Sequence, residues 1–376
     1  MKVLFLSSWF PSRVHPTLGN FVQAHAEAAA LFHDVTVLYI AKDEHLLAIE
    51  IEESIENKLR IVRVYYPAKF GKIAGRYRAF RAGIKFLGLK KGSFHIAQLN
   101  MIWNEGWQAM YLKRKFGLEY VISDNWTGYH PDQRGTLSTY IKMYMRMVAN
   151  QSALLVPVTL QLERAMRNLG FKPDSMIVPN TVAVETFSIS HFSNQKMRFL
   201  HVSHLDQKHK NIFGILSVWK QFSDEFKDVE LHIGGDGPWE NIALEADRLN
   251  IRKDSLFSFG PQNREGVAKL MKNSDCLVLF SNYENLPLVI VEAMACGLTI
   301  IAADVGGISE HIANHPFHKL IEKKNESQLL QALIESRIER KAVDHLSIRQ
   351  YAIDHFSMDA VGRAFTQAYT KALSQK

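Results

Sequence analysis

Two glutamates eight residues apart are the most informative chemical groups in this sequence. Glu284 and Glu292 enclose the segment ENLPLVIVE, which follows a short apolar run typical of a buried strand. Pro287 suits a first helical turn, because the amide that proline lacks would have no helical partner there. The segment therefore predicts a loop carboxylate, a helix start and a second carboxylate inside the helix.

The predicted helix start is a candidate site for an anion. The first amides of a helix have no partner within it, and the helix dipole makes this end positive. We therefore expect four backbone positions to border a bound diphosphate, namely Asn285, Leu286, Pro287 and Leu288.

Glu292 is the exception in the apolar run LVIVEAMA. A carboxylate is costly to bury without a partner, so we expect it to be hydrogen-bonded. Helical side chains tilt toward the helix start, where ribose hydroxyls of a nucleotide would be good donors. A structural carboxylate that caps a loop amide is the alternative interpretation.

The elements that must position these groups alternate between strand and helix. β-Branched runs predict strands at 3–7, 35–40, 60–65, 94–99, 119–123 and 153–157, then at 198–203, 229–234, 255–259, 275–280 and 298–302. Helical stretches separate most of the first series, around 20–32, 74–88, 105–116, 136–150 and 160–168. This alternation is typical of parallel sheets covered by helices on both faces.

Two series of strands predict two doubly wound α/β domains. We expect an acceptor-side domain over 1–180, a polar linker over 179–196 and a donor-binding domain over 190–357. The stretch 358–376 should return to the first domain as a C-terminal helix. Open α/β folds bind ligands at the carboxyl ends of their strands, so a cleft between the two domains is the expected site.

Composition fits this organisation. The 376 residues suit two domains, and 47% hydrophobic with 22% charged residues is typical of globular chains. Cys276 and Cys296 lie in apolar runs and should be buried thiols in a reducing compartment. We find no signal peptide and no run of membrane-spanning length, so a cytoplasmic location is expected. The formal net charge of +7 favours anionic partners.

In these motifs the sequence resembles the large retaining glycosyltransferase family four. That family belongs to the glycosyl transferases of group 1 and has the GT-B fold. ENLPLVIVE followed by EAMACGLTIIAADVGGISE resembles the family's motif of two glutamates separated by seven residues. The resemblance also includes HIGGDGP (232–238), FGP (259–261), WFPSRVHPTLGNF (9–21) and DNWTGY (124–129). It implies two Rossmann-like domains that face each other across a cleft.

The resemblance also implies roles for the donor-site residues. Glu284 would contact the transferred sugar, Glu292 the ribose and Pro261 the base. Gly19 resembles the glycine that lets backbone amides approach the donor phosphate, and an ordinary loop glycine is the alternative. Lys210 stands at the position of a family lysine that neutralises the leaving diphosphate, with Lys208 as a competing candidate and surface lysines as the alternative for both.

Two residues depart from the family pattern. His204 stands where the family usually has an arginine, and Asn125 where it usually has a histidine that contacts the sugar. An amide bonds a hydroxyl but carries no proton at neutral pH. His130 could substitute for that histidine, although a solvent-facing loop residue is the expected interpretation. These changes are compatible with a specialised donor pocket, and equally with weak activity.

A dense basic run suggests a second surface. Eight basic and no acidic residues lie between Lys69 and Lys91, and Ile73, Tyr77, Phe80, Ile84 and Leu87 would form one stripe on a helix. This pattern fits an anionic membrane or a phosphate-bearing lipid acceptor. We expect Lys72, Arg76, Arg81 and Lys85 on this face. A helix packed on the sheet with a solvated basic rim is the alternative.

The sequence thus predicts a retaining, metal-independent glycosyltransferase that needs no cofactor. It would move a sugar from a nucleotide-diphosphate donor, UDP favoured over GDP, to a hydroxyl of a glycan or lipid-linked acceptor in polysaccharide synthesis. Peripheral contact with the inner face of the cell membrane is expected, and nucleic acid is not an expected partner. An epimerase or phosphorylase on the same fold, or a non-catalytic nucleotide-binding protein, remain the alternatives.

Overall fold

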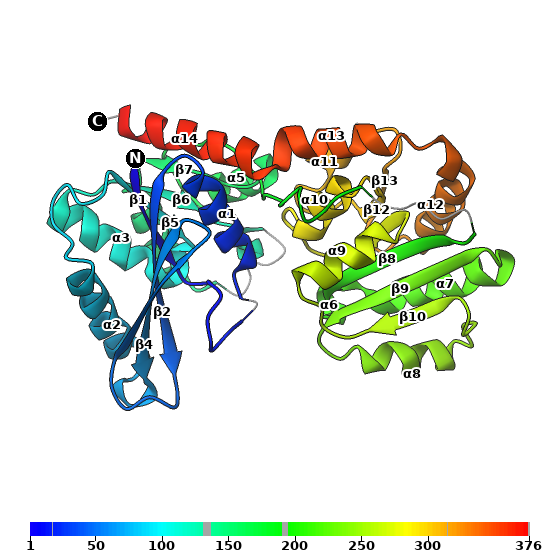
Figure 1. Cartoon of the computed structure of the whole chain (residues 1–376), viewed down its shortest axis with the longest axis horizontal. Coiled ribbons are helices and arrows are strands. Elements are labelled where there is room, and N and C mark those ends of the chain that lie inside the picture. The colour runs from blue at the N-terminus through cyan, green and yellow to red at the C-terminus, as the bar shows by residue number, and fades with distance from the viewer. Residues whose placement is uncertain (17, 131–136, 190–194, 314, 375–376) are drawn as a thin grey trace. The chain divides into compact units, whose positions relative to one another are not determined.

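The chain divides into two compact units in the computed structural model (Figure 1). Unit 1 comprises Met1–Thr181 and Met358–Lys376, and unit 2 comprises Val182–Ser357. The structure describes all residues except 17, 131–136, 190–194, 314 and 375–376. Part of the predicted linker, 190–194, lies outside the described residues.

Unit 1 is built on a seven-stranded sheet. Its strands are β1 (Lys2–Ser7), β2 (Asp34–Asp43), β3 (Glu50–Glu56), β4 (Leu59–Pro67), β5 (Ile96–Asn100), β6 (Tyr120–Ser123) and β7 (Leu154–Leu155). Its helices are α1 (Asn20–Ala30), α2 (Lys72–Phe86), α3 (Ile102–Phe116), α4 (Thr139–Ala149), α5 (Leu160–Asn168) and α14 (Met358–Ser374), with short 3₁₀ turns η1 (Ala68–Phe70) and η2 (Thr127–Tyr129).

Unit 2 repeats this plan on a six-stranded sheet. Its strands are β8 (Met197–His204), β9 (Val229–Asp236), β10 (Leu256–Phe259), β11 (Cys276–Leu279), β12 (Thr299–Ala303) and β13 (Lys319–Ile321). Its helices are α6 (Gln207–Lys210), α7 (Ile212–Glu225), α8 (Glu240–Arg248), α9 (Arg264–Lys272), α10 (Leu288–Ala295), α11 (Ser309–Ile312), α12 (Glu326–Glu339) and α13 (His345–Phe356), with the 3₁₀ turn η4 (Arg340–Ala342).

Both sheets have the strand order of a Rossmann fold. The spatial orders are β3-β4-β2-β1-β5-β6-β7 and β10-β9-β8-β11-β12-β13. Without β3, the parallel strands of each sheet follow the doubly wound order, which reverses direction beside the first strand. The reversal lies between β1 and β5 in unit 1 and between β8 and β11 in unit 2. The prediction of two doubly wound α/β domains is confirmed.

One strand of unit 1 corrects the expectation of a wholly parallel sheet. β3 pairs antiparallel with β4 at the edge, and no strand was predicted over its residues. Its sequence EIEESIE is mostly acidic, because the glutamates of this edge strand form ion pairs with arginines of β4 in place of a hydrophobic pattern. Arg63 contacts Glu52 at 3.3 Å and Glu56 at 3.1 Å, and Ile55 is 81% exposed. β13 was missed too, because it is only three residues long.

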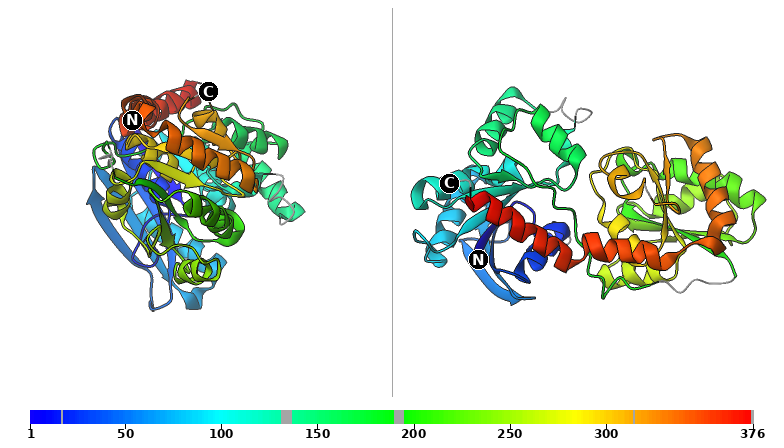
Figure 2. Two further views of the ribbon diagram at one scale, coloured as in Figure 1. Left: turned by 90° about the vertical axis from the view of Figure 1, so that its right-hand side faces the viewer. Right: turned by 90° about the horizontal axis from the view of Figure 1, so that it is seen from above.

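Helices cover both faces of each sheet (Figures 1 and 2). In unit 1, α14 lies against α1, and a Cβ on Gly362 would be 2.4 Å from the carbonyl oxygen of Ala28. The Tyr369 hydroxyl also donates to Gln98 Oε1 of β5 at 2.5 Å. These contacts make the C-terminal helix part of the core of unit 1, joined by Val361, Phe365 and Tyr369.

Cys276 and Cys296 are buried free thiols, as the sequence predicts. Burial raises the pKa of each thiol to about 12. Among the described residues, no helix combines the length and apolar character that crossing a membrane requires. Within the same part of the chain, no group of three or more His, Cys, Asp and Glu side chains is placed to hold a metal ion.

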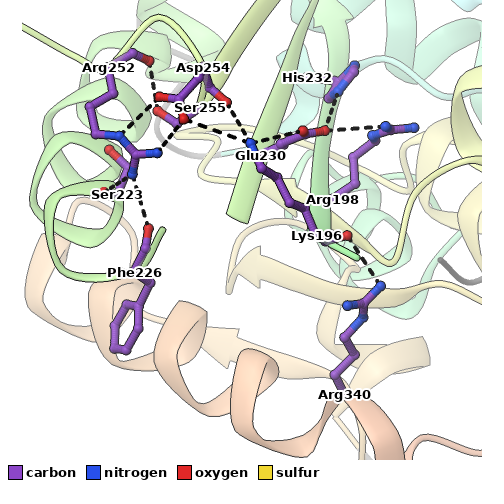
Figure 3. Close-up of polar contacts among 10 residues, drawn as sticks. All are labelled: Lys196, Arg198, Ser223, Phe226, Glu230, His232, Arg252, Asp254, Ser255 and Arg340. Carbon is purple, nitrogen blue, oxygen red and sulfur yellow. Dashed lines mark hydrogen bonds and ion pairs between the residues drawn. The ribbon is translucent and has the colours of Figure 1, made fainter. Parts of the chain in front are cut away.

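A polar network fastens β10 of unit 2 to the end of α7 (Figure 3). Arg252 donates to the carbonyl oxygens of Ser223 at 2.6 Å and Phe226 at 3.4 Å. The same guanidinium contacts both carboxylate oxygens of Asp254, at 3.1 and 2.7 Å. Arg252 therefore supplies hydrogen bonds to carbonyl groups at the end of a helix, where intrahelical donors are missing.

We expect Arg252→Ala to destabilise unit 2 by about 1–3 kcal/mol, because it removes charge-assisted hydrogen bonds to part-buried carbonyl groups. Hydrogen exchange of the β10 amides measures this loss within the full chain. Arg248→Ala is the matched control, since that side chain is 69% exposed and pairs with Glu245 on the same helix. An exposed pair of this kind contributes about 0–1 kcal/mol. Equal effects of the two variants would contradict the role given to Arg252.

Candidate functional site

The candidate site of unit 2 lies where its strand order reverses. β8 and β11 are neighbouring parallel strands, so the loops that follow them leave the same edge of the sheet. The loop after β8 contains the short helix α6, and the loop after β11 leads into α10. Open α/β sheets bind ligands at this edge.

Lys210 and Glu284 form an ion pair between these two loops. The lysine Nζ contacts glutamate Oε1, and the side chains are only 18% and 10% exposed. The two predicted catalytic residues are 74 positions apart in the chain, and the fold brings them into contact. Lys208, the competing candidate, is exposed and forms no such pair within the described chain.

Asn282 connects the loop of Glu284 to the turn that carries Lys210. Its backbone N–H donates to the carbonyl of His209 at 2.7 Å, and its side-chain amide donates to the carbonyl of Lys208 at 2.9 Å. Asp206 caps the same turn by accepting from the Lys208 N–H at 2.8 Å. Asn282 was not among the predicted site residues. Its position three residues after the buried strand β11 was the available signal.

Gly306 is a second residue that the sequence analysis did not assign to the site. It follows β12, the neighbour of β11, and has a φ of +60°. A Cβ there would lie 2.0 Å from the carbonyl oxygen of Glu284, so only glycine permits this approach. The next residue, Gly307, donates its N–H to Asn285 O at 3.0 Å. The GG pair in ADVGG was the signal.

The start of α10 differs slightly from the expectation. Pro287 does not lie in the first turn, because its ψ of 134° is extended and the helix begins at Leu288. The Pro287 carbonyl accepts from Ile290 N at 3.1 Å, which makes proline the capping residue. No side chain caps this end, and the first turn has no acidic residue. The positive end of the helix is thus not neutralised by its own sequence. Asn285 and Leu286 just before it are buried.

Glu292 is half-buried in the middle of α10. No described residue donates a hydrogen bond to its carboxylate, so the alternative, a cap on a loop amide, is not found in this part of the chain. The expected partner is a ribose hydroxyl of a ligand, and that hydrogen bond stays a prediction. Withdrawal from water raises the pKa of Glu292 to about 7, and the positive charge of Arg264 on α9 partly offsets that rise. The carboxylate therefore keeps its capacity to accept hydrogen bonds from a ligand.

The raised pKa predicts how stability depends on pH. The unfolded chain loses this proton near the usual value of 4.5, before the folded chain does near 7. The free energy of unfolding should therefore fall as pH rises through this window, by about 3 kcal/mol for Glu292 alone. Glu292→Gln stays neutral and should be more stable than the parent chain at pH 8, but not at pH 4, in urea denaturation. Glu265→Gln, at an exposed position on α9, should leave the profile unchanged.

Two other predicted residues of unit 2 lie near the ends of strands. His204 ends β8 and is exposed. Pro261 follows β10 and is also exposed. Neither has a described contact that assigns it to a sugar, a base or a phosphate, so their roles stay predictions.

Gly19 and Asn125 belong to unit 1. Gly19 precedes α1 with a φ of +81°, and a Cβ there would lie 2.4 Å from the backbone carbon of Trp9. A glycine is therefore needed here because a side chain would collide with the backbone of Trp9 in the same chain. Asn125 Nδ2 donates to Asn180 Oδ1 at 3.3 Å. His130 is partly exposed in the loop after η2, and its role stays a prediction. The residues after it, 131–136, lie outside the described part of the chain.

The basic helix of unit 1 differs from the predicted uniform stripe. Phe80 and Ile84 are buried in the core, whereas Ile73 and Tyr77 are 88% and 47% exposed. The apolar stripe is therefore exposed only near the start of α2. Among the predicted basic residues, Lys72, Arg81 and Lys85 are exposed. Arg76 turns inward, because its guanidinium contacts the buried Glu105 at 3.1 Å.

The second unit carries a match to a known family model. Residues 184–354 fit the family model described as glycosyl transferases group 1. This match spans nearly all of unit 2. The protein of Bacillus subtilis strain 168 that is named teichuronic acid biosynthesis glycosyltransferase TuaC is 22% identical over 358 residues, which cover 89% of this chain and 88% of that protein.

Solved structures extend the likeness over both units. Sucrose-phosphate synthase from Thermosynechococcus elongatus has a TM-score of 0.79 at 17% identity, with 100% of each chain covered. Anabaena HepE in complex with UDP-glucose has a TM-score of 0.72 at 14% identity, again with 100% of both chains covered. At these identities the comparison shows the fold alone. The chain has the GT-B fold, as predicted.

Proposed function

We propose that this chain is a retaining glycosyltransferase that moves a sugar from a nucleotide-diphosphate donor to an acceptor hydroxyl. The observation that carries the proposal is the Lys210–Glu284 ion pair at the strand reversal of unit 2. The loop of Glu284 leads directly to the uncapped start of α10, which lies in the part of the chain that matches the glycosyl transferases group 1 model. A cation, a carboxylate and a helix start in one place suit an activated sugar.

Each group has a task in the proposed reaction. The bond between the anomeric carbon and the diphosphate oxygen breaks, and charge grows on the leaving nucleotide. Lys210 and the first amides of α10 stabilise that charge. Glu284 orients the sugar, and Glu292 accepts hydrogen bonds from the ribose hydroxyls. The acceptor oxygen attacks the anomeric carbon from the same face that the nucleotide leaves, so the anomeric configuration is retained. The proton of the acceptor hydroxyl passes to the departing phosphate.

The proposal favours UDP as the nucleotide and a glycan or a lipid-linked glycan as the acceptor. The UDP-glucose bound to HepE and the teichuronic acid pathway in the name of the Bacillus relative support this choice. The reaction as proposed needs neither a cofactor nor a metal ion. We place it in the cytoplasm, at the inner membrane face where the acceptor is lipid-linked.

A panel of nucleotide sugars tests the proposal. We expect one UDP-sugar to raise the melting temperature, because a ligand that binds only the folded chain stabilises it. The same donor should release UDP when an acceptor is added, with unchanged rate in the presence of EDTA. Proton NMR of the product should show the anomeric configuration of the donor. Conversion of the donor without any acceptor would indicate an epimerase, and a requirement for inorganic phosphate would indicate a phosphorylase.

A further inference from the structure

Unit 1 contains a polar cavity at the carboxyl edge of its sheet. The cavity has a volume of about 410 Å³ and is lined at the ends of β1, β2 and β4 by Ser8, Tyr39, Lys42 and Tyr66. The Ser8 hydroxyl is buried and has no hydrogen-bond partner within the described chain. A buried hydroxyl without a partner is costly, and a polar ligand in the cavity would satisfy it.

A second cavity next to it is apolar and larger. It has a volume of about 850 Å³, within the range of about 300–1,000 Å³ that small-molecule sites occupy. Three helices form its walls, with Ile73 and Tyr77 from α2, Trp103 and Trp107 from α3, and Tyr140 and Tyr144 from α4. Ile73 and Tyr140 are 88% and 86% exposed at its border. Apolar side chains this exposed indicate a binding surface.

The aromatic walls of the apolar cavity are held by contacts between helices. Tyr144 Oη accepts a hydrogen bond from the backbone N–H of Trp107 at 2.8 Å, which connects α4 to α3. Trp107 packs against Phe80 of α2 with ring centroids 5.0 Å apart. These contacts fix the spacing of the three helices, so the cavity belongs to the folded unit.

Three residues line both cavities, and two of them are cationic. Lys72, Arg76 and Asn104 stand where the polar cavity meets the apolar one. Lys72 is exposed and has no ion pair within the described residues. Arg76 contacts Glu105 through Nη1, and its buried Nε has no partner among the described atoms. The junction therefore offers one unpaired cation, Lys72, beside the Arg76 guanidinium, which is paired with Glu105 but keeps an N–H donor without a partner among the described atoms. A cation next to a guanidinium donor suits a phosphate.

We propose that these joined cavities bind one phosphate-bearing lipid, with its polar group in the first cavity, its phosphate at Lys72 and Arg76, and its hydrocarbon chain in the second. This inference rests on the proposed function for the lipid's role as acceptor. The order of polar cavity, cations and apolar cavity matches the order of groups in such a molecule. It also explains why Ile73 and Tyr77 are exposed while Phe80 and Ile84 of the same stripe are buried.

The charge on this surface supports a lipid phosphate over a neutral lipid. No acidic residue lies between 69 and 91, and Glu105, the carboxylate that contacts Arg76, is 1% exposed. A single bound lipid also differs from adsorption on a bilayer. Lys85 is exposed on the same helix but lines neither cavity, so a bound lipid should not depend on it.

Calorimetric titration of the full chain with dodecyl phosphate below its micellar concentration tests the inference. We expect saturable binding of one molecule, and inorganic phosphate and dodecyl maltoside should each bind at least about tenfold more weakly, because each lacks one of the two matching groups. Lys72→Glu should weaken binding about tenfold or more by replacing a cation with an anion beside the phosphate. Ile73→Asp should weaken it by a similar factor.

Two matched variants serve as controls. Lys85→Glu makes the same change of charge on α2 outside both cavities, and Leu47→Asp replaces an apolar residue that is 80% exposed elsewhere on unit 1. Both should bind dodecyl phosphate like the parent chain. Equal loss in Lys72→Glu and Lys85→Glu would indicate adsorption by net charge and overturn the inference. Absence of saturable binding, or equal binding of inorganic phosphate, would overturn it too.

The proposed sugar transfer and the proposed lipid site can be tested independently of each other. Lys210→Ala lies in unit 2 and should leave dodecyl phosphate binding unchanged. Release of UDP from a donor without any binding of the lipid probe would contradict the acceptor inference alone. Binding of the probe in a chain that cleaves no nucleotide sugar would contradict the proposed transfer reaction and leave the lipid site intact.

Discussion

Lys210→Ala should lower the rate of nucleotide release by about a hundredfold or more, because a preorganised charge at the leaving group typically contributes 10²–10³ in kcat. The change removes the cation that the fold holds against Glu284, in a position where both side chains are mostly buried. It also leaves the Glu284 carboxylate without its partner, which favours misplacement of the sugar-binding loop. Single-turnover release of UDP from the preferred donor measures the effect directly.

Lys208→Ala is the control for this variant. Lys208 lies on the same short helix, carries the same charge and is exposed. We expect its rate to stay within about twofold of the parent, because solvent screens an exposed charge. The melting temperature separates a chemical role from a structural one. If Lys210→Ala lowered the melting temperature but released UDP at the parent rate, the ion pair would only support the loop.

The order of the elements could be predicted because buried parallel strands are nearly continuous apolar runs. VLFLS and DCLVLF belong to such strands, and each runs to the edge where a site residue follows. β3 could not be predicted in this way. Its acidic residues pair with arginines of β4, and such pairs are visible only once the two strands are aligned.

The candidate site could be predicted from the sequence only in part. Local sequence indicates a carboxylate before a helix, but it does not say which lysine reaches it. Lys210 contacts Glu284 because Asn282 holds the turn of α6 through two hydrogen bonds to its backbone. Residues 74 apart in the chain meet through the pairing of β8 and β11, which the sequence shows only as two separate apolar runs.

The helix stripe shows how far periodicity alone can be used. Ile73, Tyr77, Phe80 and Ile84 repeat at helical spacing, which predicts one face. The periodicity does not indicate how much of that face the sheet covers. α2 packs on the sheet through two glycines: a Cβ on Gly75 would lie 2.4 Å from Tyr66 Cδ2 of β4, and one on Gly83 would lie 2.8 Å from Leu38 Cδ1 of β2. Ile73 and Tyr77 point away from this contact and line the apolar cavity instead.

Gly306→Ala should abolish most activity while the chain stays folded. The new methyl group would meet the Glu284 carbonyl oxygen at 2.0 Å and the Asn285 carbonyl oxygen at 3.0 Å, so the loop that carries the carboxylate must shift. A displacement of about 1 Å in a positioning group can cost about a hundredfold in rate. We therefore expect nucleotide release to fall by about that factor, and donor affinity to fall with it.

Gly88→Ala isolates the part of this effect that comes from the backbone alone. Gly88 has a φ of +56°, close to the +60° of Gly306, but a Cβ there would meet nothing within 4 Å. Both variants should therefore lose about 1–2 kcal/mol from the unfavourable φ of alanine. Only Gly306→Ala should lose activity, because only its methyl group displaces Glu284. Parent-level UDP release by Gly306→Ala, measured at a temperature where both variants are folded, would show that the position of this carboxylate does not control the reaction.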